Sequence, residues 1–251
     1  GSISFLYFAD RIAQLPLGII GIALGSVLLT SLSKSNASKD KKSFSNDLIT
    51  SFTIGLFFSI PTAVVFINFS ELFIRVLFER GEFTSIETIQ TSHALIAYSF
   101  GIPAFIILKS CQPVFFAEGD TKTPLYVGVV LLTLNVFLSI LLMYYWRHAG
   151  IALATSISSW IGVIIYLLLL IKSGKILKSG NSQFNKHLSY SSLVVYSFKI
   201  FMVSLIMLAI MKLLSHVSLI YQINEILSIS LLVIFGLLTY VLTTFILGYI
   251  P

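Results

Sequence analysis

Seven apolar runs, each long enough to cross a bilayer, constrain this chain more than any other feature of its sequence. A transmembrane helix needs about 20 predominantly apolar residues. Polar segments separate runs of that length at Ile3–Leu32, Leu48–Phe69, Ala94–Phe116, Pro124–Tyr145, Ala149–Ile171, Leu193–Leu214 and Ile226–Leu247. Only 10% of the residues are charged, against about 25% in soluble domains. The sequence therefore predicts an all-α polytopic membrane protein with about seven transmembrane helices.

Basic residues are divided unevenly between the two sides of these spans. The loops after the first, third and fifth spans hold Lys34, Lys39, Lys41, Lys42, Lys122, Lys172, Lys175, Lys178 and Lys186, and the other side holds Arg75, Arg80, Arg147 and Lys212. Cytoplasmic loops carry the excess of Lys and Arg. We therefore expect loops 33–47, 117–123 and 172–191 to be cytoplasmic and the N-terminus to lie on the outer side. The net charge of +6 then suits an anionic inner leaflet, and no nucleic-acid partner is predicted.

The first span carries two adjacent ionisable residues, Asp10 and Arg11. Side chains at i and i+1 point to different sides of a helix, so each needs its own partner. A charge at the bilayer centre costs about 2.5–3.5 kcal/mol on insertion scales, and an intramembrane Arg is by default a functional-site hypothesis. The alternative is that Arg11 reaches the nearer interface and only anchors the helix. The residues alone leave both interpretations open.

Pro16 and the glycines that follow it predict an irregular, closely packed segment in the same span. Proline has no N–H, so the carbonyl of Ile12 loses its helical donor and we expect a bend, which membrane helices tolerate. Gly21 and Gly25 form a G-x-x-x-G pattern, which lets another helix approach closely. Such patterns also occur wherever membrane helices simply pack together.

Several polar residues predict helix boundaries rather than chemistry. In residues 70–83 the charged and apolar positions follow a helical period, which predicts a short interfacial helix ended by Gly81. Thr123 followed by Pro124 predicts the N-cap of the fourth span. Lys109, near the end of the third span, is expected to extend toward the inner interface.

Asn135 and Thr155 are polar residues near the middle of the fourth and fifth spans. They predict either a weak cation site or hydrogen bonds between helices. The second interpretation is favoured because hard cations prefer carboxylate ligands, and Ser139, one turn from Asn135, supplies none. The histidines lack H-E-x-x-H spacing, and Cys111 has no partner cysteine in the chain. We predict no catalytic residue, no metal site and no cofactor.

A series of short motifs occurs in a fixed order over residues 1 to about 156. It comprises Tyr7-Phe8-Ala9-Asp10-Arg11, Leu15-Pro16-Leu17-Gly18, Gly21-Ile22-Ala23-Leu24-Gly25, Leu77-Phe78-Glu79-Arg80-Gly81-Glu82-Phe83, Ala97-Tyr98-Ser99-Phe100-Gly101, Pro113-Val114-Phe115-Phe116-Ala117, Gly119-Asp120-Thr121-Lys122-Thr123-Pro124 and His148-Ala149-Gly150-Ile151. In this order the motifs resemble the MurJ (MviN) family, the bacterial lipid II flippases of the multidrug/oligosaccharidyl-lipid/polysaccharide exporter superfamily.

The resemblance implies a fold of fourteen transmembrane helices in two lobes around a central cavity, of which this chain looks like helices eight to fourteen. Residues 1–171 would be the core spans of the second lobe, 172–191 a basic cytoplasmic linker, and 192–251 an additional helix pair that forms a lipid-side groove. The sequence has no initiating Met and ends just after an apolar run, so we expect both ends to be cuts in a longer protein.

The resemblance also implies roles for individual residues. Arg11 sits at the position of one of the cavity arginines thought to hold the pyrophosphate of lipid II, and Asp10 would orient or balance it. A guanidinium suits this role because it binds phosphate oxygens bidentately. Pro16, Gly21 and Gly25 would be conformational residues. This chain has Gln14 and Ser139 where relatives have acids, so coupling to sodium or to the membrane potential stays open.

The expected function is that of a transporter, not an enzyme. As part of a lipid II flippase, the chain would help to move an undecaprenyl-pyrophosphate-linked saccharide from the inner to the outer leaflet by alternating access, for peptidoglycan synthesis and cell shape. The expected partners are lipid II or another polyprenyl-pyrophosphate glycolipid, membrane lipids, and the missing N-terminal half of the same protein. The alternatives are a related drug/cation antiporter or polysaccharide exporter, and an inactive split-gene membrane scaffold.

Overall fold

The regular elements of the chain are all helical, as the sequence predicts. The computed structural model describes residues 1–37, 41–173, 190–220 and 224–249. Its elements are α1 (Ser2–Pro16), the π-helix η1 (Leu17–Gly21), α2 (Ile22–Ala37), α3 (Lys41–Phe78), α4 (Ser85–Phe116), α5 (Lys122–Lys172), α6 (Tyr190–Ile220) and α7 (Glu225–Ile246). Lys39 lies outside the described residues, and so do residues 174–189. The latter make up most of the predicted cytoplasmic linker.

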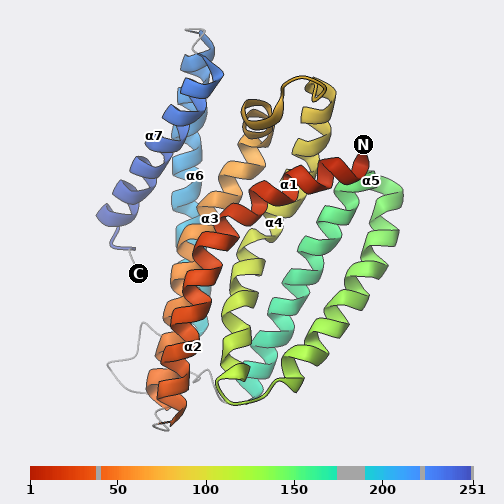
Figure 1. Ribbon diagram of the computed structural model, residues 1–251. Helices are drawn as coiled ribbons and strands as arrows, with labels where there is room; N and C mark the ends of the chain where they lie inside the picture. The colour runs from red at the N-terminus through yellow and green to blue at the C-terminus, as the bar shows by residue number, and fades with distance from the viewer. Residues whose placement is uncertain (38–40, 174–189, 221–223, 250–251) are drawn as a thin grey trace.

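Six helical segments in the described part of the chain are long and apolar enough to cross a membrane. The fourth and fifth predicted spans both lie in α5, which reverses direction at Arg147 (φ 49°, ψ −129°) and forms a helical hairpin (Figure 1). We call residues 122–146 its first arm and 148–172 its second arm. The six segments thus account for the seven predicted spans.

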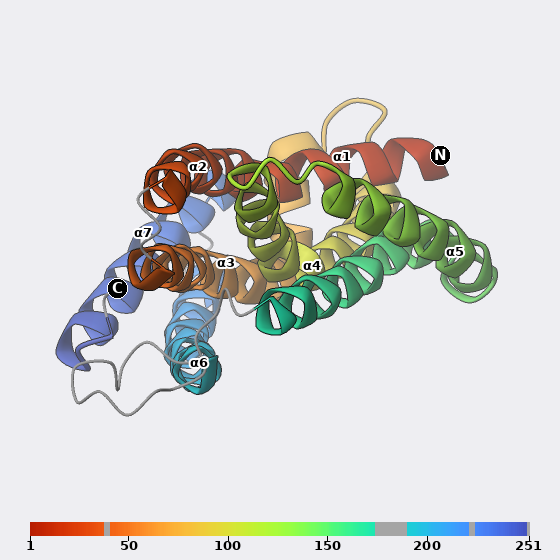
Figure 2. The ribbon, with the colours of Figure 1, turned by 90° about the horizontal axis from the view of Figure 1, so that it is seen from below.

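The helices pack side by side around α3 and α4. Viewed along the helices in Figure 2, α1 and α2 line one side of α3 and α4, the α5 hairpin lies at one end, and α6 and α7 lie at the other. One buried cluster joins α2, α3, α4 and the second arm of α5 through residues such as Leu48, Cys111 and Tyr166. A second joins α1, α3 and α4. The lipid-facing sides of α5 and α7 keep large apolar residues exposed, as a bilayer requires.

The pair α6–α7 attaches to the rest of the chain mainly through α3. Phe57 of α3 packs with Met211 of α6 and Tyr240 of α7 in a third buried cluster. The Tyr240 hydroxyl donates a hydrogen bond to the Phe57 carbonyl at 2.6 Å. At the same end as the chain's N-terminus, Arg75 forms an ion pair with Glu225 at 3.5 Å.

The bend predicted at Pro16 is present. The π-helix η1 begins at the next residue, and α1 crosses the molecule at an angle to α2 (Figure 1). A π-helix is a widened turn that often interrupts α-helices at functional sites. Here it follows directly from the missing N–H donor of Pro16.

Two predicted boundaries are displaced. The interfacial helix exists as the last part of α3, beyond a break at Phe69 (φ −121°, ψ 18°), but it ends at Phe78 and Gly81 (φ 60°) lies in the turn that follows. The prediction of Thr123 as an N-cap is wrong. The Asp120 carboxylate instead accepts bonds from the backbone N–H groups of Lys122 and Thr123, both at 3.0 Å. A carboxylate at this position satisfies two free donors at once, so the helix begins earlier.

Candidate functional site

A cavity of about 490 Å³ lies between α1, η1, α4 and the second arm of α5. We call it the polar cavity. Its lining comprises Asp10, Ala13, Gln14, Leu17, Gly18, Tyr98, Phe105, Leu108, Lys109 and Thr155. A carboxylate, an ammonium, an amide and two hydroxyls therefore converge inside a segment of the protein that spans the membrane. Polar groups at that depth are costly, which marks them as functional candidates.

Asp10 and Arg11 point in different directions, as expected for neighbours on a helix. The Gln14 amide donates a hydrogen bond to the Asp10 carboxylate one turn away. Arg11 is exposed, and its guanidinium lies 4.9 Å from the centre of the Tyr7 ring in a cation–π contact. Among the described residues no carboxylate forms an ion pair with Arg11. The charge of Arg11 is therefore available to an anion that approaches the exposed side of α1.

Lys109 is a site residue that the sequence interpretation missed. Its ammonium donates a hydrogen bond to the Leu17 carbonyl of η1 at 3.4 Å, a partner that the sequence did not predict. Gly21 makes this possible, because a Cβ on Gly21 would lie 2.6 Å from the Lys109 side chain. The predicted close approach at Gly21 is thus present, whereas a Cβ on Gly25 would make only ordinary contact at 3.9 Å. The available signal was a lone charge inside the apolar α4 run.

The predicted polar residues of α5 bond to one another across the hairpin. The Asn135 amide donates to Thr155 Oγ1 at 3.1 Å and to Ser158 Oγ at 3.2 Å. Ser139 donates to the Asn135 carbonyl oxygen at 3.4 Å. In the described part of the chain, no three His, Cys, Asp or Glu residues gather as metal ligands would. The geometry is that of a hydrogen-bonded contact between the two arms.

Replacing Asn135 with Ala tests whether this cluster also holds a cation. We expect the variant to lose about 0.6–2 kcal/mol of stability, the usual range for hydrogen bonds between membrane helices. We also expect the thermal midpoint of the wild-type protein in detergent to be equal in sodium chloride and choline chloride. A rise in the midpoint with sodium that Asn135→Ala abolishes would instead establish a cation site.

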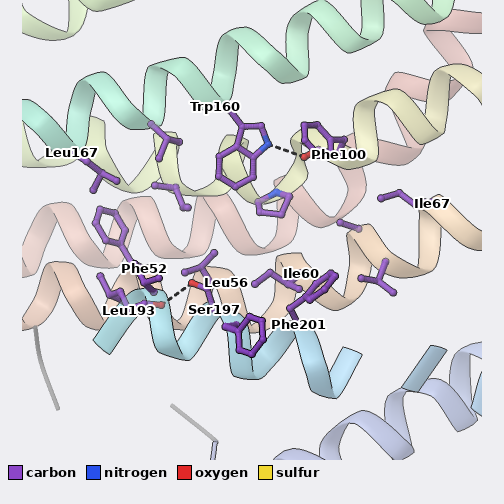
Figure 3. Close-up of a pocket in the computed structure, with 17 residues that line it drawn as sticks. Phe52, Leu56, Ile60, Ile67, Phe100, Trp160, Leu167, Leu193, Ser197 and Phe201 are labelled. Carbon is purple, nitrogen blue, oxygen red and sulfur yellow. Dashed lines mark hydrogen bonds between the residues drawn. The ribbon is translucent and has the colours of Figure 1, made fainter. Parts of the chain in front are cut away.

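A second cavity, of about 530 Å³, lies between α3, α4, the second arm of α5 and α6. We call it the apolar cavity. Figure 3 shows its lining, in which the polar side-chain atoms are already bonded: Trp160 donates to the Phe100 carbonyl at 3.0 Å and Ser197 to the Leu193 carbonyl at 2.7 Å. Helix α4 lines the apolar cavity with Pro103 and Ile107 and the polar cavity with its other face. The two cavities therefore lie on opposite sides of α4.

Comparison with known proteins identifies the family of this chain. The family profile described as "Lipid II flippase MurJ" matches residues 1–232. The chain belongs to the MurJ family. This confirms the family that the motifs resemble.

Curated MurJ relatives and a solved MurJ structure resemble the chain over most of its length. A probable lipid II flippase MurJ from Rickettsia prowazekii is 41% identical over 160 residues, which cover 64% of this chain and 32% of the relative. A probable lipid II flippase MurJ from Buchnera aphidicola subsp. Schizaphis graminum is 34% identical over 203 residues, which cover 80% of this chain and 40% of the relative. A structure of the lipid II flippase MurJ in an inward closed conformation superposes with a TM-score of 0.77 at 31% identity, covering 98% of this chain and 47% of that one. The chain thus spans less than half the length of these MurJ proteins.

Proposed function

We propose that this chain forms part of a flippase that moves lipid II, an undecaprenyl-pyrophosphate-linked saccharide, from the inner to the outer leaflet of the bacterial cytoplasmic membrane. The observation that carries the proposal is the exposed guanidinium of Arg11, which forms no ion pair with any described residue, on the helix that also lines the polar cavity. An anionic head group needs a cationic, hydrated path while its lipid tail stays in the bilayer.

The charges around the polar cavity suit a pyrophosphate. Asp10 accepts a bond from Gln14, so it is held on the cavity side of α1 instead of pairing with Arg11. The Lys109 ammonium has a neutral carbonyl as its partner. A phosphate oxygen is a stronger partner than a carbonyl because the hydrogen bond is then charge-assisted at both ends. We infer that the head group meets Arg11 on the exposed side of α1 and Lys109 inside the polar cavity, at separate points of its path.

The polyprenyl tail requires an apolar surface, and the side of the molecule that α6 covers offers one. The apolar cavity lies between α6 and the core helices. The polar cavity lies across α4 from it, so we place the head group and the tail on separate paths. On the basis of the lysine distribution, we propose that the N-terminus of the chain faces outward. Because the relatives are more than twice as long as the region matched, transport is proposed for the whole flippase to which these helices contribute.

Complementation of a flippase-depleted bacterium by the full-length protein tests this proposal. We expect restored growth and restored exposure of lipid II at the outer leaflet, measured with an added enzyme that acts only on exposed lipid II. Absence of rescue despite normal insertion into the membrane would reject the proposal. Export of a cationic dye without rescue of growth would indicate an antiporter. The absence of both activities would indicate a membrane scaffold.

A further inference from the structure

A third cavity, of about 390 Å³, lies at the turn of the α5 hairpin, away from the polar cavity. Its lining comprises Gln90 and His93 of α4 and Tyr145, Trp146, Arg147, His148 and Ala149 of α5. We call it the turn pocket. The turn of the α5 hairpin lies at the same end of the molecule as the N-terminus and the turn between α3 and α4 (Figure 1). The lysine distribution predicts that this end faces outward.

Arg147 occupies a backbone conformation that its side chain disfavours. Its φ of 49° is the only positive φ of a non-glycine residue in the described part of the chain. Such residues are strained and cluster at functional sites, where the surrounding structure maintains them. Glycine would occupy this turn without that strain. The turn itself therefore does not require an arginine at this position.

The turn is held rigidly enough to present that side chain in one place. His148 is buried, and its Nε2 lies 2.8 Å from the Gln90 carbonyl of α4, so this nitrogen carries the proton. The ring of Phe5 from α1 packs edge-on against the His148 ring at 5.3 Å between centres. Contacts with α1 and α4 thus hold His148 of α5, the residue next to Arg147, in place. Binding of a ligand would therefore cost little conformational entropy at this turn.

The turn pocket has a positive charge and no carboxylate in its lining. Two acids near the neighbouring turn, Glu79 and Glu87, are engaged elsewhere. Glu87 accepts a bond from the backbone N–H of Thr84 at 2.9 Å. Glu79 accepts one from Thr88 at 2.6 Å and pairs with Arg75 at 3.6 Å. No ion pair involves Arg147 within the described ranges, so the pocket attracts an anion.

Aromatic residues place the turn pocket at the depth of lipid head groups. Tyr144, Tyr145 and Trp146 are 85%, 69% and 55% exposed, and exposed Tyr and Trp concentrate at membrane–water interfaces. The anions present at that depth are lipid phosphates, which arginine binds bidentately. A head group that also carries an ammonium would need a carboxylate partner, which the lining lacks. We propose that the turn pocket binds the phosphate of a lipid whose head group has no cation, either an anionic glycerophospholipid or a polyprenyl pyrophosphate.

Native mass spectrometry of the full-length protein in detergent tests the proposal. The protein is titrated with dioleoyl-phosphatidylglycerol, with undecaprenyl pyrophosphate and with dioleoyl-phosphatidylethanolamine. We expect one of the two anionic lipids to bind more tightly than phosphatidylethanolamine, and Arg147→Gly to weaken that binding about tenfold because a charge-assisted bidentate contact is lost. The lipid that responds to the substitution identifies the source of the phosphate.

Lys212→Ala is the matched control, since it removes one exposed positive charge of α6 from the same predicted face without touching the turn pocket. The control should bind both anionic lipids like the wild type. The proposal would be overturned if Arg147→Gly and Lys212→Ala lost the same affinity for the anionic lipids, or if Arg147→Gly lost none. It would also be overturned if the wild type bound phosphatidylethanolamine as tightly as the anionic lipids. Arg147→Lys is a second variant, which keeps the positive charge but loses the bidentate geometry, and it should retain part of the binding. Aggregation of both Arg147 variants would show that the arginine serves the fold, which also rejects it.

Discussion

Arg11→Ala in the full-length protein should abolish rescue of flippase-depleted cells while the protein level in the membrane stays normal. Among the described residues the guanidinium contacts an aromatic ring and forms no ion pair with a carboxylate, so its removal should not unfold the chain. Loss of a charge-assisted contact with a phosphate costs about 1.5–3 kcal/mol, which corresponds to at least a tenfold loss of head-group affinity. Growth after depletion, with the variant quantified by immunoblot, measures the effect.

Two further variants separate substrate binding from anchoring. Arg11→Lys keeps the charge but loses the bidentate geometry, so we expect partial rescue. Lys34→Ala removes an exposed charge near the end of α2 and should rescue fully. Full rescue by Arg11→Ala would mean that Arg11 is an interfacial anchor, and the assignment of Arg11 to the substrate site would then be withdrawn.

Gly150→Ala should prevent the α5 hairpin from closing. An added Cβ would lie 2.3 Å from the carbonyl oxygen of Leu142 and 2.5 Å from its carbonyl carbon. These are backbone atoms of the opposite arm, which cannot rotate away as a side chain can, so the arms must separate. We expect a cost of at least about 3 kcal/mol, the upper end of the range for overpacking. Thermal unfolding in detergent, followed by fluorescence-detected gel filtration, measures the loss.

Gly128→Ala provides the control for that experiment. It is the same substitution in the first arm of α5, at a glycine whose added Cβ meets no atom within 4 Å. Alanine is about 1 kcal/mol better than glycine inside a helix, so this variant should be at least as stable as the wild type. If Gly150→Ala and Gly128→Ala had the same thermal midpoint, the close contact between the arms would be absent in the folded protein.

The sequence predicts those features of the fold that depend on local composition. Apolar runs give the spans, and the missing N–H of Pro16 gives the bend. Asn135 was correctly expected to bond between helices. Features that depend on which helices meet could not be predicted in the same way. The partner of Lys109 is a carbonyl that lies 92 positions away in the chain, and it became reachable only because η1 and Gly21 leave room for the lysine side chain.

The hairpin turn and the cap of α5 show the same limit at shorter range. The sequence separates the two spans near Arg147 but gives no sign that this arginine would take a positive φ, since glycine or asparagine is the usual choice. At the start of α5, the Thr123-Pro124 pair predicted the cap, but the Asp120 carboxylate bonds the first free N–H groups instead. The carboxylate prevails because it bonds two N–H groups simultaneously, which a hydroxyl at Thr123 could not do.

The π-helix η1 fixes the rotational phase between the two halves of the first membrane-spanning segment. Each residue advances an α-helix by about 100°, and a π-turn accommodates one residue more than an α-turn does. If the same residues Leu17–Gly21 were wound as an α-helix, α1 would therefore be turned by about 100° relative to α2. Asp10 would then leave the polar cavity and Arg11 would face a different neighbour. The direction in which the charged pair points is thus set by the number of residues in one turn of helix.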